Sequence, residues 1–253
     1  MIAGVRGGRA LARLLIVVGL FVAWELAPLV GLVDPRLLPR ATTVFATLAD
    51  LLSSAGFRKG LWITLAETGV SFMIAVPLGF LLGILIAESR YMTAVLRPLI
   101  FFIFSIPKSI FLPLFILLLG IGYFEKVAFG VFSTIFIVVM MAFAAIESVK
   151  DEHVKVARSY AASRRQTIFW VYLPSMTPVF LETVRIAMIF NFTGILLAEM
   201  YASRFGLGNQ IGAWGQGFQL AQLMAAILLV AALSIAFNEA VRALETRFEH
   251  WRG

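Results

Sequence analysis

A few charged and polar side chains interrupt apolar stretches of this chain, and they are its candidates for chemistry. Lys108 lies in one such stretch, and Arg185, Asn191 and Glu199 lie in another, nearer the C-terminus. A charge inside an apolar segment of membrane length is costly, so by default it faces protein, water or an opposite charge. We therefore place these four residues on a solute pathway as a hypothesis, in which Lys108 and Arg185 favour an anionic solute.

The charged residues among them also have structural alternatives. Lys108 can extend its ammonium group toward water or pair with a carboxylate. Arg185 can pair with Glu182, which lies three residues earlier on the same helix face. Glu199 is either a gating or docking carboxylate or a structural cap. The sequence leaves these alternatives open.

Other kinds of chemistry find no support in the residue inventory. The chain has no cysteine, and its two histidines, His153 and His250, lie in segments expected to face water without further ligands nearby, so we expect no metal site. No G-x-x-x-x-G-K-[ST], H-E-x-x-H or G-x-S-x-G pattern occurs. The chain is therefore not expected to be an enzyme or to bind ATP through a P-loop, and energy for pumping must come from a partner or an ion gradient.

The composition is that of a membrane protein. Of 253 residues, 61% are hydrophobic, the mean hydropathy is +0.95, and several apolar runs approach the roughly 20 residues that cross a bilayer. A net charge of +7 would suggest nucleic acid in a soluble protein, but here it is better explained by the cytoplasmic excess of Lys and Arg that fixes topology. We expect no nucleic-acid partner.

The apolar runs predict an all-α, polytopic fold with about six spans in a single transmembrane domain over residues 1–253. The spans are expected at about 14–32, 63–87, 95–122, 127–146, 177–200 and 220–243. The third span carries Pro98, Pro107 and Pro113, so it is expected to be kinked, or else to form two re-entrant halves.

Smaller signals describe the first half of the chain. Glu25 interrupts the first span, where we expect a structural hydrogen bond at a helix end or between helices. Thr42 is expected to cap a short amphipathic helix before the second span. In that span, Gly79 and Gly83 form a G-x-x-x-G pattern that lets helices approach closely.

The polar stretch 148–176, between the fourth and fifth spans, has a helical pattern of its own. Val154, Ala157 and Ala161 recur at helical spacing along a short basic helix. Ser163 and Gln166 form a capping box that starts a second helix at about Arg164. Pro174 is expected to end that helix. The stretch therefore predicts a helix–turn–helix suited to contact another protein.

The same stretch resembles the "EAA" loop of ABC-importer permeases, whose pattern is EAA, three residues, Gly, nine residues, Ile, one residue, Leu-Pro. Lys155-Val156-Ala157 occupies the EAA position, and Val171 occupies the Ile position. Leu173-Pro174 matches outright. Two identities depart from the pattern, because Lys155 replaces the glutamate and Ala161 replaces the glycine.

Two further blocks are similar to the nitrate/taurine/sulfonate branch of these permeases. The first is Ser105–Gly122, with Pro107, Pro113, Gly120 and Gly122, and the second is Ala198–Ile211, with Gly206 and Gly208. Gly206 and Gly208 would also let the backbone turn tightly after the fifth span.

The resemblance implies a type I ABC importer permease that moves a small solute delivered by a binding protein, and Lys108 and Arg185 favour an anionic one. It implies an ATPase-coupling role for Lys155, Val156, Ala157, Ala161, Ser163, Leu173 and Pro174. The expected partners are two ATPase subunits, an extracytoplasmic solute-binding protein, a second copy of the chain and the lipid of a bacterial inner membrane. The chain itself binds no cofactor, since ATP and Mg are held by the partner ATPases.

The charge distribution predicts the orientation. Thirteen Lys and Arg residues fall in segments expected inside and six in segments expected outside, which places both termini and the stretch 148–176 in the cytoplasm. An ion-driven secondary transporter is the alternative function, although no inverted repeat supports it. A scaffold subunit without transport is a third possibility.

Overall fold

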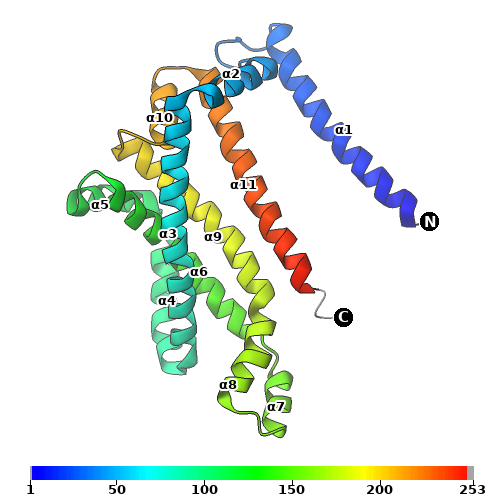
Figure 1. The fold of residues 1–253 in the computed structure, drawn as a ribbon, viewed down its shortest axis with the longest axis vertical. Coiled ribbons are helices and arrows are strands. Elements are labelled where there is room, and N and C mark those ends of the chain that lie inside the picture. Colours follow the sequence, from blue (N-terminus) through cyan, green and yellow to red (C-terminus); the bar gives the residue numbers. More distant parts are fainter. Residues whose placement is uncertain (1, 250–253) are drawn as a thin grey trace. The chain divides into compact units, whose positions relative to one another are not determined.

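The computed structural model describes residues 2–249, and these form helices joined by short connections (Figure 1). The helical elements are α1 Ile2–Leu29, α2 Ala41–Ser53, α3 Ala55–Glu88, α4 Arg90–Ser105, η1 Lys108–Phe111, α5 Leu112–Leu119, α6 Tyr123–Glu147, α7 Asp151–Ser159, α8 Arg164–Thr167, η2 Ile168–Tyr172, α9 Leu173–Ala202, α10 Leu207–Gln216 and α11 Leu220–Glu249. No strand occurs among them, in agreement with the expected all-α fold.

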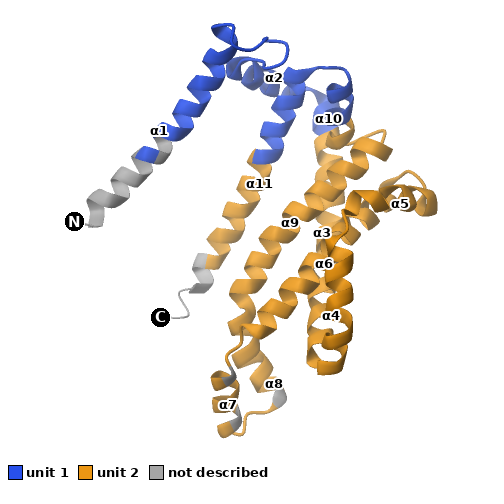
Figure 2. Cartoon of the chain, turned by 180° about the vertical axis from the view of Figure 1, so that it is seen from behind, with its two compact units in different colours: residues 1–59, 210–231 blue, residues 60–209, 232–253 orange. Residues whose placement is uncertain are grey.

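The helices gather into two compact units, which Figure 2 shows in blue and orange. The first comprises residues 1–59 and 210–231, and the second comprises residues 60–209 and 232–253. The single domain expected over 1–253 stays a prediction. All the candidate functional residues lie in the second unit.

The helix lengths fit a polytopic membrane protein. Within residues 2–249, four helical stretches are long and apolar enough to cross a membrane: Ala55–Glu88, Tyr123–Glu147, Arg165–Ala202 and Leu220–Glu245. The bent pair Arg90–Ser105 and Lys108–Leu119 adds a fifth crossing if it is one span. The shorter apolar helix Leu15–Leu29 lies where the first span was expected.

The third expected span is broken more sharply than a kink. α4 and the segment Lys108–Leu119 meet at 86°, with Pro107 before η1 and Pro113 in the first turn of α5. Proline lacks the amide donor, so it is favoured at such helix starts, whereas Pro98 lies inside α4. Gly120 ends α5 with φ +72°, a conformation that glycine adopts without strain. Gly122, in an extended conformation, precedes α6.

The core of the second unit is built around α6 and α9, which pack along each other. One buried cluster joins Val76 of α3, Val138 of α6 and Ala187 of α9. Another joins Leu112 of α5 to Phe129 and Ala198 of the central pair. These two clusters hold three of the long helices and the short α5 together by apolar burial.

The G-x-x-x-G pattern of α3 lies against α6, as expected for packing within the fold. A Cβ atom added at Gly79 would lie 2.9 Å from Cβ of Val138, and one added at Gly83 would overlap Cβ of Ala142. The absence of side chains at both positions therefore permits the close approach of the two helices.

In the first unit, Glu25 has the structural role expected of it. Its carboxylate accepts hydrogen bonds from the backbone N of Thr42 (3.0 Å) and from Thr42 Oγ1 (2.9 Å). The prediction that Thr42 caps the helix was wrong, because α2 begins at Ala41 and its N-cap residue Arg40 makes no side-chain cap. Glu25, 17 residues earlier, instead accepts from this first turn, where the helix leaves its amides unpaired. Trp24 Nε1 also donates to the carbonyl of Pro39 (2.9 Å).

We predict that Gly83→Ala destabilises the protein by about 1–3 kcal/mol, because the new methyl group would overpack the α3–α6 crossing. The matched control is Gly69→Ala in the same helix, where an added Cβ meets nothing within 4 Å. The control should be neutral or stabilising, since alanine favours helix over glycine. Thermal unfolding of the purified protein in detergent compares the two. Equal melting temperatures for both variants would contradict the assigned crossing.

Candidate functional site

A cavity of about 260 Å³ lies in the second unit. Its walls come from η1 (Lys108, Ser109), α6 (Phe129, Ser133) and α9 (Ile189, Phe190, Thr193, Gly194, Leu197). Of the four pathway residues expected from the sequence, Lys108 alone lines this cavity. The bend between α4 and α5 brings it there, because the chain turns at that point.

Lys108 neither extends its ammonium group toward water nor pairs with a carboxylate of the described residues. These were the two structural alternatives considered for it. Its Nζ donates hydrogen bonds to the backbone carbonyls of Ile103 (2.9 Å), Phe104 (2.8 Å) and Ile106 (2.9 Å). These carbonyls lie at the C-terminal end of α4, where the helix leaves its acceptors unpaired and carries a partial negative charge. Lys108 therefore caps the broken helix, and the break itself supplies its partners. The rings of Phe104 and Phe136 lie 5.1 Å and 5.6 Å from Nζ.

Arg185 forms an ion pair, but its partner is not the one expected. It contacts Glu245 of α11 instead of Glu182. Both side chains of this pair are 26% exposed. A partner on a separate helix cannot be found from local spacing, which explains why the sequence pointed to the residue three positions away.

Asn191 is fully buried where three helices cross. Its Oδ1 accepts from Ser71 Oγ of α3 (3.0 Å), and its Nδ2 donates to the carbonyl of Gly130 in α6 (3.4 Å). Asn191, Arg185 and Glu199 do not line the cavity in this conformation, and their pathway role stays a prediction.

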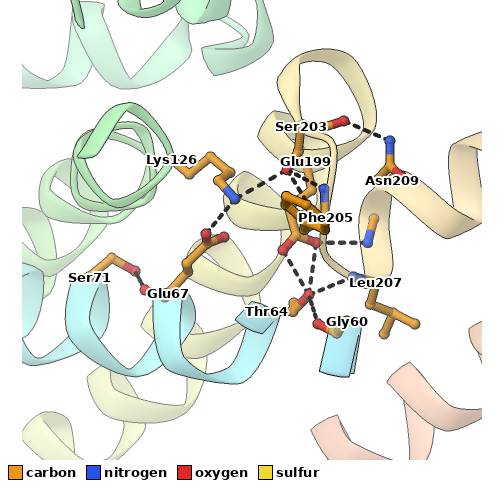
Figure 3. Close-up of polar contacts among 11 residues, drawn as sticks. Gly60, Thr64, Glu67, Ser71, Lys126, Glu199, Ser203, Phe205, Leu207 and Asn209 are labelled. Carbon is orange, nitrogen blue, oxygen red and sulfur yellow. Dashed lines mark hydrogen bonds and ion pairs between the residues drawn. The ribbon is translucent and has the colours of Figure 1, made fainter. Parts of the chain in front are cut away.

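The geometry of Glu199 matches the structural-cap alternative (Figure 3). Its carboxylate is fully buried and accepts from the backbone N of Gly208 (2.7 Å), in the first turn of α10, and from Thr64 Oγ1 (2.8 Å). Thr64 Oγ1 in turn accepts from the backbone N of Leu207 (2.7 Å). Gly206, at φ +109°, has no side chain, and a Cβ there would overlap the carboxylate. The glycine-rich turn thus folds directly over Glu199.

Beside this cap lies a buried ion pair that the sequence analysis missed. Lys126, at the start of α6, contacts Glu67 of α3, and their side chains are 5% and 1% exposed (Figure 3). Lys126 Nζ also donates to Ser203 Oγ (3.2 Å). The sequence could have identified Glu67, because it is a charged residue inside an apolar segment. The same criterion identified Lys108. Lys126 is one of the six Lys and Arg residues that the sequence analysis counts in segments expected outside.

The stretch 148–176 contains the predicted helix–turn–helix elements α7 and α8. The capping box is confirmed: the backbone N of Ser163 donates to Gln166 Oε1 (2.8 Å), and the backbone N of Gln166 donates to Ser163 Oγ (3.3 Å). α8 begins at Arg164, as expected. Lys155, Val156 and Ser163 are exposed, and Ala157 is half-buried.

Ala161 makes the turn between the two helices in a left-handed conformation, at φ 53°. The backbone N of Ala162 donates to the carbonyl of Ala157 (3.0 Å), which is the bond that closes a Schellman motif after α7. Glycine is the usual residue at such a position. The left-handed conformation therefore explains why the EAA pattern has glycine at this position. Ala161 adopts the same conformation with some strain.

The prediction that Pro174 ends the second helix was wrong. α8 continues through the π-helical turn η2 into α9, and Leu173 and Pro174 lie in the first turn of α9. A first turn does not need the missing amide of proline, and the wider turn before it accommodates the ring. The knob formed by α7 and α8 is thus connected to the long helix α9 without an intervening loop.

No group of metal-ligating side chains occurs within the part of the chain that the structure describes. His153 is exposed, and His250 lies outside the described residues.

The long apolar helices, a half-buried cation at a cavity and an exposed helical knob define the class: a polytopic membrane protein of transport type. Residues 75–250 match the family described as binding-protein-dependent transport system inner membrane component, and the chain belongs to this family. It is the permease subunit of an ABC importer and not an enzyme. Import is driven by ATP hydrolysis in separate subunits and depends on a solute-binding protein, so the ion-driven and scaffold alternatives are set aside.

Individual relatives agree with this assignment. The chain is 29% identical to the taurine transport system permease protein TauC of Escherichia coli (strain K12), over 92% of this chain and 86% of that protein. It is 27% identical to the putative aliphatic sulfonates transport permease protein SsuC of Bacillus subtilis (strain 168), over 90% and 83%. Its fold resembles a bacterial ABC transporter involved in the import of the acidic polysaccharide alginate, with a TM-score of 0.66, 19% identity and 96% coverage of each chain.

We predict that Lys126→Met costs about 3–5 kcal/mol of stability, because it leaves Glu67 charged and buried without its partner. The double variant Lys126→Met, Glu67→Met should recover most of this loss, since an apolar pair needs no compensation. Thermal unfolding in detergent measures both. A double variant no more stable than the single one would show that the two side chains do not form an energetically coupled pair.

We also predict that Ala161→Gly stabilises the turn by about 0.5–1 kcal/mol. Glycine removes the strain of a left-handed alanine, which is about 1–2 kcal/mol. Against this, the greater conformational entropy of glycine in the unfolded chain costs about 0.4–1 kcal/mol. Hydrogen exchange of the amides around residues 155–166 should slow roughly two- to fivefold. The control Ala162→Gly gains no such relief and should speed exchange. Faster exchange in Ala161→Gly would contradict the strained turn.

Proposed function

We propose that two copies of this chain form the pathway of an importer for a small anionic solute in a bacterial inner membrane. Both termini and the knob of α7 and α8 lie in the cytoplasm in this proposal, as the distribution of Lys and Arg favours. Two ATPase subunits hold ATP and Mg, and a binding protein delivers the solute from the other side.

The observation that carries the coupling role is an exposed knob that fixes its own shape. The capping box at Ser163 and the Schellman turn at Ala161 pair the ends of both helices locally. Such a knob keeps its form without neighbours, so its outer surface is available to a partner. The small or short side chains of Val156 and Ala157 would permit close approach of an ATPase groove.

The mechanism follows from the continuity between the knob and a central helix. ATP binding would draw the two ATPases together, and α7 and α8 would move with them. Because the chain passes from α8 through η2 into α9 without a loop, this displacement would be passed to α9, which packs along α6. A shift of this pair would exchange inward-facing and outward-facing states.

The anionic class of the solute is supported by Lys108, the cation at the cavity. The relatives named for taurine and aliphatic sulfonates suggest a compact sulfonate-like anion.

We predict that Val156→Trp leaves the protein folded, because this side chain is 56% exposed, but reduces ATP-dependent uptake roughly tenfold or more by overfilling the contact with the ATPase. Uptake of radiolabelled methanesulfonate is measured in proteoliposomes that contain the permease, its ATPase and its binding protein. Val156→Ala keeps the surface small and should retain uptake. Normal uptake and ATPase binding by Val156→Trp would refute the docking assignment.

A further inference from the structure

We propose that the cavity beside Lys108 holds the anionic head group of the solute during passage, with Lys108 supplying the charge and Ser133 a hydrogen bond. The proposal rests on the proposed function and adds to it a binding site and a second residue. The site would take one negative charge spread over several oxygens, as in a sulfonate or a carboxylate.

The position of the cavity suits a site within a pathway. Ser133 lies ten residues after Tyr123, the first residue of α6, which corresponds to about 15 Å along the helix. The hydrocarbon core of a bilayer is about 30 Å thick, so a span that enters the core at the start of α6 would hold the cavity near half depth. Its walls come from three separate elements, η1, α6 and α9, and a relative shift of α6 and α9 would alter it directly.

The charge at the cavity is fixed before any solute arrives. Three carbonyls hold Nζ of Lys108, so little side-chain entropy remains to be lost on binding. The end of a helix carries only about half an elementary charge, and the ammonium group therefore leaves a net positive potential. None of the described residues that line the cavity is acidic, so the potential is not cancelled locally.

Ser133 supplies an unused hydrogen-bonding group in the same wall. The residue is 3% exposed, and its Oγ has no hydrogen-bond partner among the described residues. Gly194 leaves room for it, because a Cβ there would lie 2.8 Å from this oxygen. The hydroxyl of Thr193, by contrast, already donates to the carbonyl of Ile189 (2.8 Å). A buried hydroxyl without a partner is unfavourable, and rotation toward a bound anion would satisfy it.

The remaining walls are largely apolar. Phe129, Ile189, Phe190 and Leu197 line the cavity together with the exposed Ser109, so a short aliphatic portion attached to the head group would also be accommodated. A single cation, hydroxyl groups beside it and largely apolar walls together favour a small organic anion with one charged end.

The test measures binding of methanesulfonate to the full-length permease in lipid nanodiscs, by calorimetry and by thermal shift at ionic strength matched with potassium chloride. Dimethyl sulfone, which has a similar size and no charge, is the matched control compound. We expect saturable binding of methanesulfonate and none of the sulfone.

Ser133→Ala should weaken methanesulfonate binding roughly tenfold, as expected for a hydrogen bond to a charged group, without loss of stability, because it removes an unpartnered hydroxyl. Lys108→Met should weaken binding further, although it also uncaps α4, so Ser133→Ala is the decisive variant. The control is Thr134→Val in the same helix, which removes a hydroxyl outside the cavity wall that already donates to the carbonyl of Gly130 (2.8 Å) and should leave binding unchanged.

Equal binding of the two compounds, no binding of either, or wild-type affinity in Ser133→Ala would overturn the site. An uptake assay with the complete transporter distinguishes a wrong binding site from a wrong proposed function. ATP-dependent uptake of an anion without binding in the permease overturns the site alone. A complete transporter that moves only uncharged or cationic solutes overturns the anionic function as well.

Discussion

A polar group placed among apolar helices must find its partner within the protein, because lipid offers none. Four charged side chains of the second unit meet this constraint. Lys108 uses the carbonyls of a broken helix, Arg185 uses a carboxylate from α11, and Lys126 uses Glu67. Glu199 accepts from the backbone amide of Gly208 at the start of α10 and from the hydroxyl of Thr64. Each partnership fixes one connection between helices, so the positions of the charges and the arrangement of the helices depend on each other.

Close helix contact is the second requirement, and small residues provide it. Gly79 and Gly83 let α3 approach α6, and Gly130 and Gly194 lie where α3, α6 and α9 cross. Gly194 both permits the crossing and accommodates the hydroxyl of Ser133 at the cavity. This one glycine therefore serves helix packing and the candidate solute site together.

The knob of α7 and α8 is held in a different manner from the spans. Its shape depends on local capping at Ser163 and on the left-handed Ala161, with little need for apolar burial. A segment stabilised in this way can move as a body and still keep its contact surface. In the proposed mechanism, the continuous path from α8 through η2 into α9 would pass this motion to the helices around the cavity.

What the sequence determined by itself was local or compositional. Helical periodicity and hydropathy predicted the all-α membrane fold, and the spacing of Ser163 and Gln166 predicted the capping box and the start of α8. The motif spacing identified the family. These features depend on residues within a few positions of one another, or on the solvent that a segment prefers.

Only the tertiary structure decided which partners the charges have. Glu245 lies 60 residues from Arg185, and Lys126 and Glu67 also lie on separate helices, so no local spacing relates them. The Pro174 prediction failed because the same residue can end one helix or begin another, and the π-helical turn at 168–172 selects the second outcome. The partners of Lys108 exist only because the chain breaks by 86° beside it. Residues far apart in the sequence become neighbours when the helices pack, and rules based on local spacing cannot predict those contacts.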